Sequence, residues 1–168
     1  IISELLEAPT SIGAEFDIMA DSLTKEEVNE FRERVGRYLA RSTSYHDQSE
    51  EKDYHNLMNG ILSTLGLEYL VISNCESGDG RYDHALIPLA DKPRNTAFIF
   101  EYKKAVNQED KELDLAVQKG LDQIDEKRYD LRVKQQPQVK RIIKVGLAFF
   151  GKRAKAKYKI EERVSGDN

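Results

Sequence analysis

Residues 97–103 read Ala-Phe-Ile-Phe-Glu-Tyr-Lys, a short apolar run that ends in two charged side chains. The run is rich in aromatic and β-branched residues, which predicts a short buried strand. Burying charge is costly unless the charge is paired or bound to a metal, so Glu101 and Lys103 at the end of such a strand indicate a functional site. Alternate residues of a strand point to one face, so these two project together while Tyr102 faces the other way.

A second acid precedes this strand. Asp83 begins the extended segment Asp83–Pro88, and a turn at residues 91–95 would fold that segment back against residues 97–103. Asp83, Glu101 and Lys103 would then converge. Two close carboxylates repel, and one shifts toward protonation unless a cation lies between them. Because oxygen ligands of this kind suit Mg²⁺ or Mn²⁺, the sequence predicts a metal site here.

The ordered motifs of the chain resemble the PD-(D/E)XK nuclease superfamily, and within it a bacterial branch often found C-terminal to an AAA-type ATPase-like domain. The resemblance covers roughly the C-terminal two thirds of the chain. It is carried by Tyr45-His46-Asp47, Tyr54-His55, residues 76–83, Phe100-Glu101-Tyr102-Lys103, Gln123-Ile124 with Tyr129, and residues 146–152. Tyr82 stands before Asp83 where the superfamily's name has proline, a departure that is common among its members.

The resemblance implies an α/β fold with a restriction-endonuclease-like core of helix, three strands, helix and strand. An extra C-terminal strand and an N-terminal helical extension would complete it. The corresponding division is residues 1–49 for the extension and 50–164 for the nuclease-like domain.

The resemblance also implies hydrolysis of phosphodiester bonds with Mg²⁺ or Mn²⁺ as cofactor. DNA is the favoured substrate, and RNA is the alternative that the sequence leaves open. Asp83, Glu101 and the carbonyl of Tyr102 would hold the metal. Lys103 would position a water molecule or offset charge on the phosphate, and Gln123 would orient the catalytic groups or the nucleic-acid backbone.

Three further residues have two possible interpretations each, and a fourth has one. His55, four residues after Glu51 on a predicted helix, is either another metal ligand or a structural hydrogen-bonding residue. Arg81 contacts phosphate or forms a salt bridge, and Tyr129 contacts substrate or belongs to the core. Lys152, at the end of the last motif, is a predicted substrate contact.

The composition of the chain limits the kinds of protein that it can be. The net charge of −4 over 168 residues means that any contact with nucleic acid depends on local positive charge. A single cysteine, Cys75, excludes an internal disulfide and is typical of a reducing, cytoplasmic environment. No apolar run approaches the ~18 residues of a membrane span, and no signal peptide is visible. The missing initial methionine suggests a segment of a longer protein.

A second hypothesis is that the domain is not an enzyme. The domain could be a non-catalytic protein-interaction module inside a larger effector or ATPase-linked protein. Intact Asp83, Glu101 and Lys103 argue against it.

Periodicity and turn residues predict the remaining elements. A loop at Gly13 would precede a helix over 24–41, begun by a capping box of Thr24 and Glu27. Further helices are expected at 54–65 and 110–129, and strands at 67–73, 142–150 and 153–160, with a loop at 74–80. The last strand has one basic face, which either protects a sheet edge or follows a phosphate backbone.

Overall fold

The structure is a computed structural model that describes residues 11–163 except residue 79, without the side chains of residues 75–77 and 81. Three helices come first, then three strands, two helices and two strands. In order they are α1 (Ile12–Thr24), α2 (Val28–Arg41), α3 (Glu51–Ser63), β1 (Tyr69–Ser77), β2 (Gly80–Pro88), β3 (Thr96–Lys104), α4 (Asp110–Glu126), α5 (Leu131–Lys134), β4 (Arg141–Phe150) and β5 (Arg153–Glu162).

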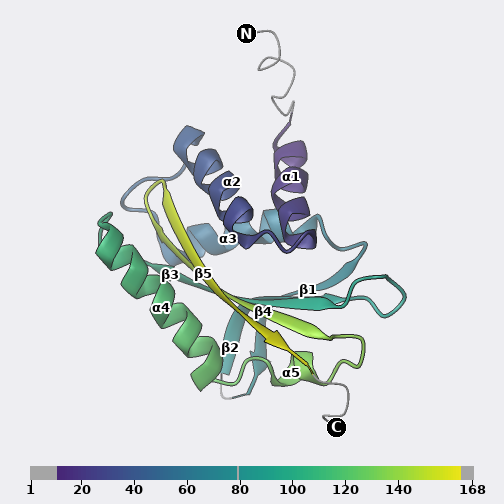
Figure 1. Ribbon diagram of the computed structural model, residues 1–168. Coiled ribbons are helices and arrows are strands. Elements are labelled where there is room, and N and C mark those ends of the chain that lie inside the picture. The colour runs from purple at the N-terminus through teal and green to yellow at the C-terminus, as the bar shows by residue number, and fades with distance from the viewer. Residues whose placement is uncertain (1–10, 79, 164–168) are drawn as a thin grey trace.

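The strands form one sheet in the order β1-β2-β3-β4-β5. β3 and β4 are parallel and are connected through α4 and α5, whereas the other neighbouring strands are antiparallel. Helices cover both faces of the sheet, with α1, α2 and α3 on one side and α4 on the other (Figure 1). The predicted α/β class and the restriction-endonuclease-like core are therefore confirmed.

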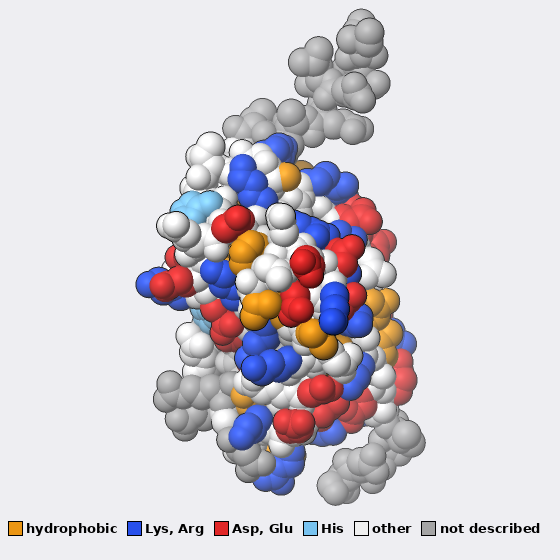
Figure 2. Space-filling view, turned by 90° about the vertical axis from the view of Figure 1, so that its left-hand side faces the viewer, with side chains coloured by type: hydrophobic (Ala, Val, Ile, Leu, Met, Phe, Trp, Pro, Cys, Tyr) orange, Lys and Arg blue, Asp and Glu red, His pale blue; other side chains and the backbone are white. Residues whose placement is uncertain are grey.

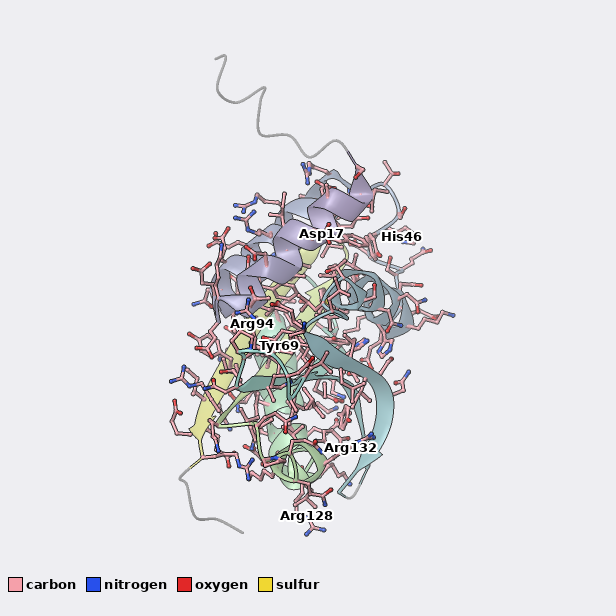
Figure 3. The ribbon with its side chains drawn as sticks, turned by 90° about the vertical axis from the view of Figure 1, so that its right-hand side faces the viewer. Asp17, His46, Tyr69, Arg94, Arg128 and Arg132 are labelled. Carbon is pink, nitrogen blue, oxygen red and sulfur yellow. The ribbon has the colours of Figure 1, made fainter. Side chains whose placement is uncertain are left out.

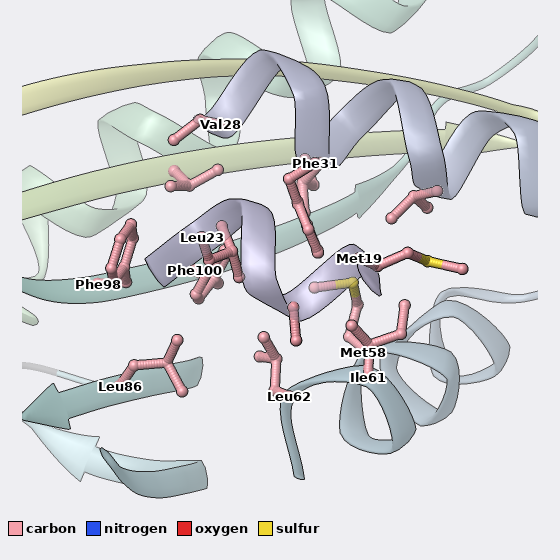
Figure 4. Packing of buried hydrophobic residues seen from close by; sticks show 14 of the residues in the cluster. Met19, Leu23, Val28, Phe31, Met58, Ile61, Leu62, Leu86, Phe98 and Phe100 are labelled. Atoms are coloured by element: carbon pink, nitrogen blue, oxygen red, sulfur yellow. The ribbon is translucent and has the colours of Figure 1, made fainter. Parts of the chain in front are cut away.

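The larger hydrophobic cluster lies between the sheet and the three N-terminal helices. Phe98, Phe100 and Tyr102 point into it from β3, and Leu23 and Phe31 are fully buried against them from α1 and α2. Figure 4 shows side chains of α1, α2, α3 and the sheet meeting in this single cluster. The N-terminal helices thus share a core with the sheet, and the predicted division after residue 49 stays a prediction.

On the opposite face, α4 packs unusually close to the middle of the sheet. A Cβ on Gly120 of α4 would lie 3.4 Å from the backbone oxygen of Glu101, and a Cβ on Gly146 of β4 would lie 2.6 Å from the backbone oxygen of Val117. Two glycines therefore let the helix approach β3 and β4 at the level of Glu101.

The predicted start of the N-terminal helix was wrong. Gly13 lies inside α1, which begins at the N-cap Ser11, and Thr24 ends this helix instead of capping the next. The Thr24 hydroxyl donates to the Asp21 carbonyl, and Glu27 caps α2 without a side-chain hydrogen bond. A left-handed residue, Glu26 with φ of 60°, makes the sharp break between the two helices.

The predicted loop at 74–80 was also wrong, because β1 and β2 continue through most of it. Cys75 pairs with Tyr82 and Ser77 pairs with Gly80, so the two strands form a long hairpin. The polar composition of this segment is compatible with a strand because β1 is an edge of the sheet. Gly78, with φ of 59°, turns the chain.

The basic face of the last strand pairs with acids on α4. β5 is an edge strand, as one of the two readings predicted. Arg153 contacts Asp110 at 2.6 Å, and Lys155 contacts Asp114 at 3.0 Å. These cations stabilise the packing of α4 across the edge, so they are not all available to a phosphate backbone.

Arg94 connects the turn before β3 to the N-terminal helices. Its Nη1 donates to the carbonyl of Thr24 at 2.8 Å, and its Nε approaches Glu68 at 3.3 Å. Figure 3 shows Arg94 beside Tyr69, with His46 toward one end of the molecule and Arg128 and Arg132 toward the other.

None of the helices between residues 11 and 163 is both long and apolar enough to cross a membrane.

Candidate active site

The charged end of β3 lies where β2 and β3 separate. The ladder between the two strands pairs residues 84–86 with residues 98–100. Beyond it, Asp83 Oδ2 accepts a hydrogen bond of 2.7 Å from the backbone N–H of Tyr102, so a carboxylate replaces a backbone acceptor. The N–H and the carbonyl of one strand residue point to the same side, so the Tyr102 carbonyl also points toward this opening.

Glu101 projects from β3 toward α4 and is only 3% exposed. Its Oε1 accepts hydrogen bonds from Lys103 Nζ at 3.0 Å and from Gln123 Nε2 at 2.7 Å. Its Oε2 is buried and has no hydrogen-bond partner in the part of the chain that the structure describes. A buried oxygen without a hydrogen-bond partner lowers the stability of a protein by about 1–3 kcal/mol or more. Oε2 therefore indicates a place where a bound ligand supplies the missing partner.

The pKa values of both carboxyl groups are raised. Burial, with the charge of Asp83, raises the pKa of Glu101 to about 7. Burial also raises the pKa of Asp83, although the N–H of Tyr102 lowers it. Lys103 keeps its charge: burial alone would lower its pKa, but Glu101 raises it above the usual value. A single lysine therefore faces two carboxylates, which leaves negative charge for a cation to neutralise.

A third acid near the site was not predicted. Glu51, in the first turn of α3, accepts a hydrogen bond of 3.2 Å from the backbone N–H of Lys104. Its charge also raises the pKa of Asp83 and of Glu101, which places it in their neighbourhood. The four-residue spacing from His55 was the one signal in the sequence, because it puts both side chains on one face of the helix.

His55 of α3 contacts both strands of the hairpin, including the site residue Asp83 on β2. Its Nδ1 is 3.5 Å from Asp83 Oδ1, and its Nε2 is 3.0 Å from Ser73 Oγ and 3.3 Å from Asn74 Nδ2. If Asn74 donates to Nε2, the Nδ1–H faces Asp83. These contacts support the interpretation of His55 as a structural hydrogen-bonding residue. A role for His55 as a metal ligand stays a prediction.

On the face of β3 opposite Glu101, buried polar side chains form a series of hydrogen bonds. The hydroxyl of Tyr102 donates to His84 Nδ1 at 2.8 Å, and His84 Nε2 lies 2.6 Å from Asn59 Oδ1. Burial lowers the pKa of His84 to about 3, so the ring is neutral and one tautomer satisfies both contacts. His55 stacks on His84 with ring centres 4.6 Å apart. This series of contacts thereby holds both Tyr102 and His55 in place.

Gln123 of α4 contacts the acid of β3 directly. Its Nε2 donates to Glu101 and also to the hydroxyl of Tyr129 at 2.9 Å. Tyr129 is 2% exposed and belongs to a hydrophobic cluster, so it supports Gln123 from within the protein. Contact of Tyr129 with substrate stays a prediction.

Arg81 and Lys152 are the two other predicted substrate contacts, and both stay predictions. The side chain of Arg81 is outside the described part of the structure, although its backbone pairs with Glu76 in the hairpin. Lys152 is exposed in the turn between β4 and β5, where it lines a surface hollow. On the face shown in Figure 2, lysine and arginine side chains are mixed with acids, so no continuous basic field covers it.

The donor set suits a hard divalent cation. Carboxylate and carbonyl oxygens are the ligands that Mg²⁺ and Mn²⁺ prefer, and the unpaired Glu101 Oε2 offers one of them. Within the described residues, no three histidine, cysteine, aspartate or glutamate side chains are grouped closely enough to enclose a metal by themselves. Water or a phosphate oxygen would have to complete the coordination, which is usual for Mg²⁺.

A family model described as the PD-(D/E)XK nuclease superfamily matches residues 49–159, about two thirds of the chain. The chain belongs to the PD-(D/E)XK nuclease superfamily. The match spans Asp83, Glu101 and Lys103 and continues from α3 into β5. No curated protein matches the chain in a sequence search. Superfamily members are typically nucleases that use divalent metals, and the predicted link to an ATPase-like domain stays a prediction.

Proposed function

We propose that this domain hydrolyses phosphodiester bonds in nucleic acid, DNA in preference to RNA, with Mg²⁺ or Mn²⁺ as its cofactor. The single observation that carries the proposal is the buried, unpartnered Oε2 of Glu101, next to Lys103 and across the strand opening from Asp83. A protein that used this strand only for packing would gain stability by replacing such a carboxylate.

Asp83, Glu101 and the Tyr102 carbonyl are the groups that would hold the cation. When bound, a divalent cation offsets negative charge on a phosphate and makes a water molecule more acidic. The fixed positions of these oxygens reduce the cost of organising the site, because β3 and the Asp83–Tyr102 hydrogen bond are already in place.

Lys103 would act on the substrate itself. Its ammonium group lies 3.0 Å from Glu101 and stays charged, and the side chain is 17% exposed, so it can contact a phosphate oxygen. A charge that is held in place where negative charge develops stabilises the transition state without reorganisation. The Lys103 ammonium would also orient a water molecule for attack on phosphorus.

Gln123 would act through Glu101. Its amide fixes Glu101 Oε1 with one hydrogen and Tyr129 with the other, so Oε2 keeps a defined direction. Gln123 is therefore proposed as a positioning residue that need not touch the substrate.

The test is cleavage of labelled single-stranded DNA, duplex DNA and RNA, each with Mg²⁺, with Mn²⁺ and with a chelator. We expect metal-dependent cleavage by the wild type, and a loss of roughly 100-fold or more in Lys103→Ala and Asp83→Ala. Lys155→Ala is the matched control, because Lys155 is also partly buried in an ion pair but belongs to the β5–α4 contact.

Cleavage that persists in both site variants, or that survives chelation, would reject the assignment. A domain that binds neither metal at millimolar concentration but captures a protein partner tightly would instead support the interaction module. The intact set of Asp83, Glu101 and Lys103 favours the enzyme.

A further inference from the structure

A hollow of about 700 Å³ lies at the end of the sheet, where β4 turns into β5. The loop before α3 contributes Tyr45, Asp47 and Gln48 to its lining, and the loop before α4 contributes Gln108. Phe150 and Lys152 line it from the β4–β5 turn. Segments that are far apart in the sequence therefore build one concave surface, which we call the β4-end hollow.

Lys104 connects the candidate active site with the β4-end hollow. Lys104 follows Lys103 directly in the chain, and both line a surface groove together with Glu51. The Lys104 Nζ donates to the carbonyl of Asp47 at 3.0 Å and lies 5.4 Å from the centre of the Phe150 ring, so it also contacts two residues of the hollow. A polynucleotide strand that leaves the site on this side reaches the hollow next.

The aromatic lining of the hollow is held rigidly from behind. The ring of Tyr45 stacks on Tyr54 with centres 5.6 Å apart, and Tyr54 stacks on Phe149 at 4.5 Å. The Tyr54 hydroxyl donates to the carbonyl of Gly151 at 2.8 Å, which ties this stack to the β4–β5 turn. Tyr54 covers one side of the half-exposed Tyr45 ring, so a planar group can stack on the part that lines the hollow.

The polar lining matches the edges of a nucleobase. Gln48 and Gln108 are exposed, and their amides offer both donors and acceptors. Asp47 brings a carboxylate, which can accept a hydrogen bond from the amino group of a base. An apolar ligand would leave these groups without partners, whereas a base satisfies donors and acceptors and stacks as well.

Lys152 supplies a cation at the edge of the hollow. It is exposed, and no ion pair of Lys152 occurs among the residues that the structure describes. Its ammonium group is thus available to a phosphate, in contrast to the neighbouring Arg153, which pairs with Asp110 at 2.6 Å.

We infer that the β4-end hollow takes an unpaired nucleobase of the substrate strand, with Lys152 on the adjoining phosphate. This inference rests on the proposed function and sharpens it, because it makes nucleic acid with unpaired nucleotides the preferred substrate class. A fully paired duplex could fill the hollow only by unstacking and unpairing a base, which costs free energy.

The test is fluorescence anisotropy with a labelled single-stranded oligonucleotide and the blunt duplex of the same sequence, in a chelator so that neither is cut. We expect the wild type to bind the single strand roughly tenfold or more tighter than the duplex. Tyr45→Leu should weaken single-strand binding about tenfold by removing a stacking ring, and leave duplex binding unchanged. Lys152→Ala, at an exposed position with little risk to folding, should weaken single-strand binding and reduce its dependence on salt.

Tyr158→Leu is the matched control, because Tyr158 is a partly exposed tyrosine on β5 outside the hollow and its replacement should change neither affinity. Equal binding of duplex and single strand, or unchanged single-strand affinity in both Tyr45→Leu and Lys152→Ala, overturns the inference. Because binding is measured without metal, a chain that shows this preference but cuts nothing retains the hollow and loses the proposed hydrolysis. A chain that cuts with metal but lacks the preference retains the hydrolysis and loses the hollow.

Discussion

Two lysine–carboxylate clusters lie on the α4 face of the sheet, and they differ in how completely their charges are paired. In the first, here called the Lys144 cluster, Lys144 of β4 is 7% exposed and contacts three acids at 2.9–3.1 Å. Two more lysines contact the same acids at 2.7–3.0 Å. Three cations thus balance three anions: Lys134, Lys144 and Lys159 with Asp125, Asp130 and Glu161.

In the second cluster, the acids outnumber the cations. Among the described residues, Asp83 and Glu101 have one lysine beside them, Lys103, which forms its ion pair with Glu101 at 3.0 Å. Glu51 of α3, from the other side of the sheet, adds a further negative charge near Glu101. One oxygen of Glu101 has no hydrogen-bond partner within residues 11–163 as far as the structure describes them. The pKa of each acid in the Lys144 cluster is lowered by its lysine partners, against the effect of burial. The pKa values of Asp83 and Glu101 are raised. The first arrangement pairs its charges within the protein, whereas the second leaves negative charge that we propose is neutralised by a bound cation.

The largest expected effect is on stability at the Lys144 cluster. Lys144→Ala removes the shared partner of three acids and should lower the free energy of unfolding by about 3–5 kcal/mol, measured by urea denaturation. Lys159→Ala, at the exposed edge of the same cluster, is the control and should cost less than about 1 kcal/mol. A similar small loss in both variants would mean that this cluster is not the structural counterpart of the active site.

The pH dependence of this stability has a definite sign. The folded protein lowers the pKa of Asp125, Asp130 and Glu161, so it binds fewer protons than the unfolded chain below about pH 5. The contribution of the cluster is therefore present at neutral pH and is lost as the pH falls. The difference between wild type and Lys144→Ala should shrink between about pH 5 and pH 3.

Glu101→Gln should have the opposite effect on the metal-free protein. The folded state raises the pKa of Glu101 to about 7, so ionised Glu101 destabilises the fold above that pH. A neutral amide of the same shape should raise the free energy of unfolding at pH 8 by roughly 1–3 kcal/mol, with much less gain at pH 4, while cleavage is lost. Destabilisation at pH 8 without metal would show that the carboxylate is a structural group after all.

Metal affinity should also follow the ionisation of Glu101. The ligand form is the carboxylate, and its pKa is about 7 without metal. Calorimetric titration with Mn²⁺ should therefore give an affinity that rises about tenfold between pH 6 and pH 8, with proton release on binding. An affinity that does not change over this range would separate Glu101 from the metal.

A smaller effect is expected at Gln123. Gln123→Leu removes both hydrogen bonds that hold Glu101 and Tyr129 without adding charge. We expect kcat to fall about tenfold with KM little changed, because positioning of Glu101 is disturbed while substrate contacts remain. An increase in KM at constant kcat would instead place Gln123 in substrate binding.

The sequence predicted the parts of this molecule that depend on local pattern. The apolar run of β3 and the two charges that follow it identify the strand and the side of the sheet on which Glu101 and Lys103 lie. The turn before β3 correctly predicted the antiparallel pairing of β2 with β3. Burial on both faces makes such a central strand readable, because nearly all of its residues must be apolar.

Other parts of the structure depend on tertiary contacts that a local sequence pattern does not show. The break between α1 and α2 is one left-handed residue, Glu26, within a sequence that has helix-forming residues on both sides. The long hairpin forms from polar residues because an edge strand has an exposed face. Glu51 joins the site only because α3 packs with its first turn against the end of β3, and this contact depends on tertiary packing.

The most direct test of the central claim is anomalous diffraction from crystals soaked in Mn²⁺. The account predicts a peak bonded to Asp83 and to Glu101 Oε2, at about 2.0–2.3 Å from each oxygen, and its absence in crystals of Glu101→Gln. A wild-type protein with no peak there, or with Mn²⁺ bound only elsewhere, would contradict it.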